Sequence, residues 1–204
     1  MICLDFDGVI ADSQPMWLDI FYRAATLFAI KLPDGFQPFK TLRPLTFETL
    51  GKNLGVDPTR FAQIMVEFAL ADDLIPPLFA GMDKTLAELA GLASLSIVSS
   101  SRVSVIQRFV MTHEISPFFQ DIVGGGTGLS KAEILRVYAE QGAQIMVGDA
   151  ASDIDAAKQA GLRSIAVDWG WQDIKMLKHA DFMVSSPAAL LDIIKKNYVP
   201  DKSK

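Results

Sequence analysis

Hydrophobic and polar positions follow two rhythms along this chain. Short apolar runs, bounded by turn residues, predict strands at 2–6, 95–99, 121–123, 145–148, 164–167 and 182–184. After residue 80, apolar positions between these runs recur at the period of amphipathic helices, at 83–92, 103–113, 131–141, 152–160, 172–178 and 187–196. Strands that alternate with helices predict a parallel sheet covered on both faces.

An early segment breaks this rhythm, because its apolar residues follow a helical period throughout. Helices are predicted at 16–29, 46–54 and 58–71, and Asp57-Pro58 is a typical helix start. The predicted fold is therefore α/β, with a Rossmann-like parallel sheet core and an inserted helical cap.

The change of period also predicts the domain bounds. Residues 1–14 and 80–204 are expected to form the core, and residues 15–79 the helical cap.

Composition narrows the class of protein. The net charge of −5 and the pI of about 5.0 do not suit nucleic-acid binding, so we expect no nucleic-acid partner. The single cysteine, Cys3, excludes an intrachain disulfide and suits a reducing compartment. Without a signal-peptide pattern or a long apolar run, we expect a cytoplasmic protein with no membrane partner. The oligomeric state stays open.

Carboxylates follow two of the predicted strands. Asp5 and Asp7 end the first strand, while Asp149 and Asp153 follow the strand at 145–148. In a parallel sheet these strand ends lie at one edge, where ligands bind. Carboxylates that converge there favour a hard cation such as Mg²⁺.

Candidate anion-binding residues follow other elements of the core. Ser99 and Ser100 end the strand at 95–99, where hydroxyl and backbone N–H groups can hold an anion. Lys131 follows a glycine-rich loop, and its charge could neutralise a phosphate and an attacking carboxylate. Simpler interpretations remain open: the serines cap a helix, Asp153 is a helix N-terminal charge, and Lys131 is solvated.

In this order, the motifs resemble those of the haloacid dehalogenase-like superfamily over the whole chain. The matching residues are Asp5-Phe6-Asp7-Gly8-Val9, Ser99, Lys131, and Gly148-Asp149 through Asp153. The site of the insert resembles the helical cap of the phosphoglycolate phosphatase and β-phosphoglucomutase branch. One departure is Ala132, where the family commonly has proline after the motif lysine.

The resemblance implies a Mg²⁺-dependent phosphatase that acts on a small phosphorylated metabolite, a phosphate monoester, through an aspartyl-phosphate. It implies Asp5 as nucleophile and Asp7 as general acid–base. The implied metal site is Asp5, Asp7 (through its backbone carbonyl), Asp149 and Asp153, and the implied phosphate site is Ser99, Ser100 and Lys131. In the insert, Arg43 is the candidate contact for an anionic substrate.

Two alternatives stay open at this stage. One is a regulatory module of the same fold that binds phosphate and Mg²⁺ without turnover. The other is a phosphomutase- or phosphonatase-type relative, although the stretch from Arg43 to Thr46 lacks the Gly-x-Ser-Arg pattern common in the mutases. Mg²⁺-dependent turnover of a phosphate ester separates the phosphatase from the binding module.

Overall fold

A computed structural model describes residues 1–72 and 74–198, in which parallel strands form one sheet. The strands are β1 (Ile2–Leu4), β2 (Leu95–Arg102), β3 (Phe119–Gly125), β4 (Ile145–Gly148), β5 (Arg163–Val167) and β6 (Phe182–Val184). Their order in the sheet is β3-β2-β1-β4-β5-β6. The first strand therefore lies inside the sheet, between β2 and β4, and its carboxyl end opens at the switch point of the topology.

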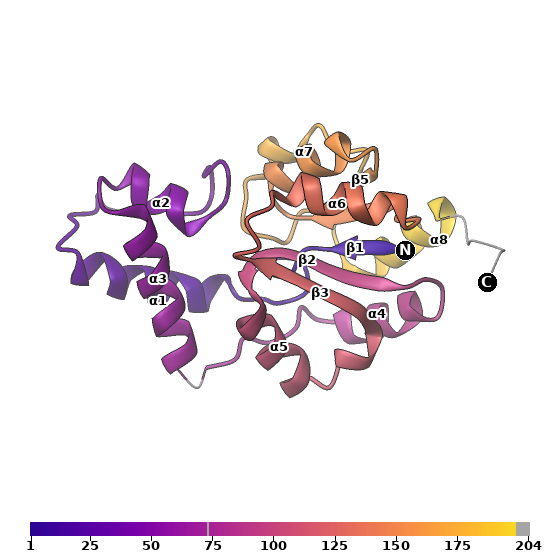
Figure 1. The fold of residues 1–204 in the computed structure, drawn as a ribbon, viewed down its shortest axis with the longest axis horizontal. Coiled ribbons are helices and arrows are strands. Elements are labelled where there is room, and N and C mark those ends of the chain that lie inside the picture. Colours follow the sequence, from indigo (N-terminus) through magenta and orange to yellow (C-terminus); the bar gives the residue numbers. More distant parts are fainter. Residues whose placement is uncertain (73, 199–204) are drawn as a thin grey trace.

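Helices cover both faces of the sheet (Figure 1). One face carries α4 (Met82–Ala90), α5 (Val103–Thr112) and α8 (Pro187–Asn197), and the other carries α6 (Lys131–Glu140) and α7 (Ala151–Gln159). Alternate residues of β1 divide between these layers: Ile2 and Leu4 pack with the first set, and Cys3 with the second. Burial on both faces explains why the strands are apolar without alternation.

The insert, residues 15–79, has a hydrophobic cluster of its own. It contains most of α1 (Gln14–Leu27), together with α2 (Phe47–Asn53) and α3 (Pro58–Ala71). Its helices lie beyond the carboxyl ends of the strands, at the left of Figure 1. Trp171, from the loop after β5, packs in the same cluster. The exact domain bounds stay a prediction.

Local sequence explains the helix starts of the insert. Thr46 accepts a hydrogen bond from the Thr49 N–H at 3.1 Å, and Asp57 accepts one from the Arg60 N–H at 2.6 Å. The predicted start of α3 at Asp57-Pro58 is thus confirmed.

The predicted helix at 172–178 is wrong. Only a 3₁₀ turn forms there, η2 (Ile174–Leu177), and Asp173 caps it. Gln172 lies outside this turn, and its side chain binds two other segments, at Ala151 and Leu42. The sheet also extends further than the apolar pattern, since β2 and β3 still pair at Arg102 and Gly125.

Within the described residues, no helix has both the length and the apolar character needed to cross a membrane.

The aromatic cluster of the insert can be tested by truncation. Phe61 is fully buried, and its ring centroid lies 5.5 Å from Phe28 and 6.4 Å from Phe21. Phe61→Ala should lower the free energy of unfolding by about 3–5 kcal/mol, because it leaves a cavity. Leu27→Ala, at a side chain that is 60 % exposed on α1, should change it by less than about 0.5 kcal/mol. Urea denaturation measures both, and equal small effects would contradict a packed core in the insert.

Candidate active site

Asp5 lies at the floor of a cavity, where β1 ends. Its own N–H donates to Val147 O on β4 at 2.8 Å, so the sheet fixes its backbone. Its Oδ1 accepts the N–H of Phe6 at 2.8 Å. Only 8 % of the residue is exposed, and that small part faces the cavity. This carboxylate is therefore held by backbone contacts and remains accessible from one side.

Asp149, Asp153 and Asp5 form a carboxylate cluster. Each offers an oxygen, and the three oxygens lie within 4.8 Å of one another. Asp149 Oδ1 is buried and has no hydrogen-bond partner among the described residues, so one acceptor of the cluster is left unsatisfied. Close oxygen ligands of this kind fit a divalent cation.

The sequence around the cluster reflects how tightly it is packed. Gly8 has φ of +76°, and a Cβ there would lie 2.1 Å from Asp149 Oδ2. Any side chain at this position would displace the carboxylate. The glycine after Asp7 is therefore required by the site as well as by the turn.

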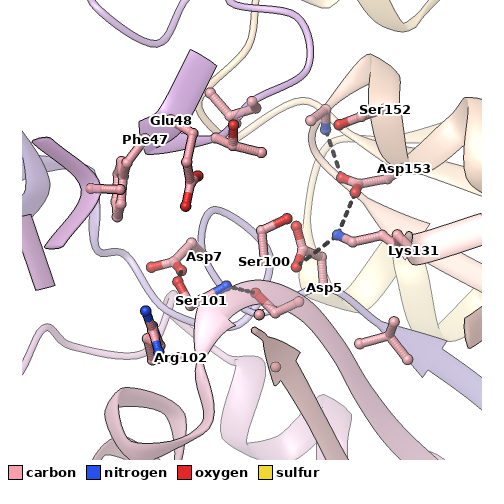
Figure 2. A pocket seen from close by; sticks show the side chains of 18 of the residues that line it. Asp5, Asp7, Phe47, Glu48, Ser100, Ser101, Arg102, Lys131, Ser152 and Asp153 are labelled. Atoms are coloured by element: carbon pink, nitrogen blue, oxygen red, sulfur yellow. Dashed lines mark hydrogen bonds and ion pairs between the residues drawn. The ribbon is translucent and has the colours of Figure 1, made fainter. Parts of the chain in front are cut away.

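Lys131 balances part of the negative charge. Its Nζ lies 2.6 Å from Asp153 Oδ1 and 3.2 Å from Asp5 Oδ1 (Figure 2). It is the first residue of α6, whose capping box, Ser130 with Glu133, fixes the helix start. Burial alone would lower the pKa of Lys131, but the two aspartates raise it, so the ammonium stays charged.

Burial lowers the pKa of a lysine but raises the pKa of a carboxyl group. It raises the pKa of Asp5 to about 7, although the Lys131 charge opposes this. Burial also raises the pKa of Asp149 well above its usual range, and the charges of Asp153 and Asp5 add to this. Without a cation, the cluster therefore resists full ionisation.

Asp7 is held apart from the carboxylate cluster. Its Oδ1 accepts hydrogen bonds from Ser13 Oγ at 2.6 Å and Trp17 Nε1 at 2.8 Å, and its Oδ2 accepts one from Ser101 Oγ. Burial raises its pKa, while these hydrogen bonds oppose the shift. The side chain of Asp7 is thus oriented by the core and by the first helix of the insert.

The remaining predicted anion-binding residues line the same cavity, which has a volume of about 270 Å³. Ser99 is buried, and its Oγ accepts the N–H of Ser101 at 3.2 Å. Ser100 is exposed toward the opening, and Figure 2 shows it beside Asp5. Lys131 and the two serines thus lie on one wall, on the core side.

Arg43 lies elsewhere. Its guanidinium forms an ion pair with Asp155 of α7, and it is not among the residues that line the cavity. The structure therefore gives it a contact between insert and core. The charged insert residue in the cavity wall is Glu48, as Figure 2 shows.

Sequence reasoning missed Trp17, Ser101 and Gln172. Ser101 could have been found, because it follows Ser99 and Ser100 directly in the same polar run at the end of β2. Trp17 carried no such signal, since it belongs to the apolar stripe of α1 like its neighbours. Its ring is buried in the insert while its N–H reaches Asp7.

Comparison with known proteins agrees with this geometry. A sequence profile of the haloacid dehalogenase-like hydrolases matches residues 2–167. The chain belongs to this family. It is 31 % identical over 204 residues to the phosphoglycolate phosphatase of Synechococcus elongatus, covering 95 % of this chain and 96 % of the relative. These similarities identify a phosphohydrolase.

Solved structures of family members share the fold. A haloacid dehalogenase-like hydrolase from Streptococcus pneumoniae superposes with a TM-score of 0.83 at 21 % identity, over 95 % of this chain and 97 % of that one. CbbY from Rhodobacter sphaeroides, solved with xylulose-1,5-bisphosphate, gives a TM-score of 0.74 at 18 % identity, over 93 % and 95 % of the two chains. The predicted α/β fold is thereby confirmed.

The raised pKa of Asp5 predicts how stability depends on pH in EDTA. Burial raises the pKa of Asp5 to about 7 in the folded protein, whereas in the unfolded chain this carboxyl has its ordinary pKa of 3.8. The contribution of this raised pKa to the free energy of unfolding is therefore fully present below about pH 4 and is lost as the pH rises through about 7. We expect the melting temperature in EDTA to fall by at least about 4 °C from pH 5 to pH 8.

Added Mg²⁺ should reduce this fall, because a cation in the cluster favours ionised carboxylates. Asp5→Asn should also reduce it, since the variant lacks the titrating group. A melting temperature in EDTA that is constant or rises over this range would contradict the predicted shift.

Proposed function

We propose that this chain is a Mg²⁺-dependent phosphatase that hydrolyses a small phosphate monoester through an aspartyl-phosphate on Asp5. The supporting observation is the position of Asp5 in the wall of an open cavity, beside Lys131 and the other two aspartates of the carboxylate cluster. Such an arrangement suits a carboxylate nucleophile that must approach an anionic phosphoryl group.

In the first step, an Asp5 oxygen attacks phosphorus, and the bond between phosphorus and the ester oxygen breaks. The departing alkoxide takes a proton from Asp7. Burial raises the pKa of Asp7, which favours the protonated form that this step needs. The products are the alcohol and phosphorylated Asp5.

In the second step, water attacks the phosphorus of the aspartyl-phosphate and gives its proton to Asp7. The bond between phosphorus and the Asp5 oxygen breaks, which releases phosphate and restores both side chains. The three donors on Asp7, from Ser13, Trp17 and Ser101, orient it for both transfers.

The ion would be held by Asp5, Asp149 and Asp153, with the Asp7 carbonyl as a further ligand, and would supply positive charge to the phosphoryl oxygens. Ser99 and Ser100 would donate hydrogen bonds to those oxygens, and Lys131 would add its charge.

The insert would act as a cap that surrounds the leaving group and excludes water. Its contribution to the cavity wall is mainly apolar, with Trp17, Phe39, Leu42 and Phe47 among the residues that face it. A cavity of about 270 Å³ suits a small metabolite. Because the chain is similar to the phosphoglycolate phosphatase of Synechococcus elongatus, phosphoglycolate is the first substrate to test.

Removal of the nucleophile is the direct test. Asp5→Asn should lower phosphate release from a panel of small esters by at least about 10³-fold, because an amide does not form the aspartyl-phosphate. Asp12→Asn is the matched control, since Asp12 is not among the residues of the cavity, and it should stay within about twofold of wild type. EDTA should abolish wild-type release, and Mg²⁺ should restore it.

Two outcomes would contradict the proposal. Turnover by Asp5→Asn at the wild-type rate would exclude Asp5 as nucleophile. Mg²⁺ binding without turnover of any ester would favour the binding module instead.

The role of Asp7 predicts a kinetic phase. p-Nitrophenolate is a leaving group that needs no proton, so Asp7→Asn should still form the aspartyl-phosphate from p-nitrophenyl phosphate. Hydrolysis of this aspartyl-phosphate should slow by about 10²–10⁴-fold, because no base then activates the water. Rapid mixing should show a burst of up to one equivalent of nitrophenol, and acid quench should trap phosphate on Asp5. Slow turnover with no burst and no trapped phosphate would contradict this division of roles.

A further inference from the structure

The loop after β5 lies directly against the carboxylate cluster. We call residues 169–173 the bridging segment. The Trp171 N–H donates to Asp149 Oδ2 at 2.6 Å. A Cβ at Gly170 would lie 2.2 Å from Asp149 Cβ, so no space separates the segment from this aspartate. The bridging segment thus occupies Asp149 Oδ2 and leaves the unpartnered Oδ1 available for an ion.

The other side of the bridging segment contacts the insert. The contacts fall on residues 39–43, which we call the insert loop. The Trp171 and Phe39 rings lie with centroids 4.8 Å apart, and the Asp173 N–H donates to Lys40 O at 3.1 Å. Gln172 Nε2 donates to Leu42 O. Phe39 and Leu42 in turn form part of the cavity wall, so this contact helps to close the site.

Gln172 joins the two sides through one side chain. Its Oε1 accepts the N–H of Ala151 at 2.8 Å, and Ala151 begins α7 two residues after Asp149. Its Nε2 binds the insert loop, so both ends of the amide are used, and the residue is only 6 % exposed. A glutamine amide can accept at its oxygen and donate from its nitrogen, which a carboxylate of the same length cannot do.

We propose that Gln172 is a positioning residue that couples ion binding at the carboxylate cluster to docking of the insert loop. The inference rests on the proposed function, because it takes the cluster as an ion site. An ion that fixes Asp149 also fixes the bridging segment and the start of α7, and these hold the amide that binds Leu42 O. By thermodynamic linkage, a docked loop must favour ion binding by the same factor.

The coupling predicts a difference between the ion-free and the ion-bound protein. The insert loop, which adds Phe39 and Leu42 to the cavity wall, should be held most firmly when the carboxylates are paired with an ion. A purely structural Gln172 would hold the loop equally well with or without an ion. The two roles therefore differ in one measurable quantity, which is the effect of Mg²⁺ on the insert loop.

Hydrogen exchange of wild-type protein, without substrate, measures this quantity. Mg²⁺ should slow exchange in a peptide that covers residues 39–43 by about 3–10-fold relative to EDTA, for a coupling of typical size. A peptide from α8 serves as the internal reference and should not change. Mg²⁺ binding is measured in parallel by calorimetry.

These outcomes separate the inference from the proposed function. No Mg²⁺ binding would overturn both. Mg²⁺ binding with unchanged exchange at 39–43 would overturn the coupling and leave the proposed function standing. This experiment needs no variant, so it does not depend on whether a substitution folds.

Variants then assign the coupling to Gln172. Gln172→Glu keeps an acceptor for Ala151 but loses the donor to Leu42 O, and Gln172→Ala loses both. Both should abolish the Mg²⁺-dependent protection and raise the Kd for Mg²⁺ by about 3–10-fold. Arg43→Ala is the matched control, because its ion pair with Asp155 joins insert and core without contacting the bridging segment. It should speed exchange in both conditions and retain the difference between them, and loss of that difference in Arg43→Ala alone would overturn the assignment.

Discussion

The burial of like charges is the constraint on which this structure depends. Asp5, Asp149 and Asp153 approach within 4.8 Å at a sheet edge that solvent scarcely reaches, with Lys131 as the cation beside them. Such a cluster opposes folding, because repulsion and desolvation both disfavour the ionised form. The protein tolerates it because backbone contacts and close packing leave the carboxylates no alternative position. Converging carboxylate oxygens of this kind fit a divalent cation.

The parallel sheet provides that rigidity. The central place of β1 allows neighbouring strands to present their ends beside Asp5, so residues from distant parts of the chain meet without long loops. Lys131 reaches the site from the first turn of α6, and Asp149 from the end of β4. Rigid helix and strand ends thus hold Lys131 and Asp149 in place.

The sequence was most informative where chemistry and backbone geometry coincide. Strand ends followed by glycine and aspartate located Asp5, Asp7, Asp149 and Asp153, and the structure brings all of them to one edge of the sheet. It was least informative for contacts between core and insert. The sequence predicts a helix at Gln172 and a substrate contact at Arg43, and neither prediction matches the structure. The partner of Gln172, Leu42, lies 130 positions away along the chain, and the partner of Arg43, Asp155, lies 112 positions away. A single sequence does not show contacts at such a separation. Periodicity reports the neighbours of a residue within its own element only.

The hydrogen bond from Trp17 to Asp7 bears on how such proteins can be engineered. Because this indole comes from the first helix of the insert, removal of the insert takes away one of the three side-chain hydrogen-bond donors to Asp7, the proposed acid–base residue. A chimaera that exchanges residues 15–79 for another insert therefore replaces a contact that orients Asp7, together with the insert's part of the cavity wall. An exchange that keeps the Trp17 contact should therefore begin after the first turn of α1, not at the start of that helix.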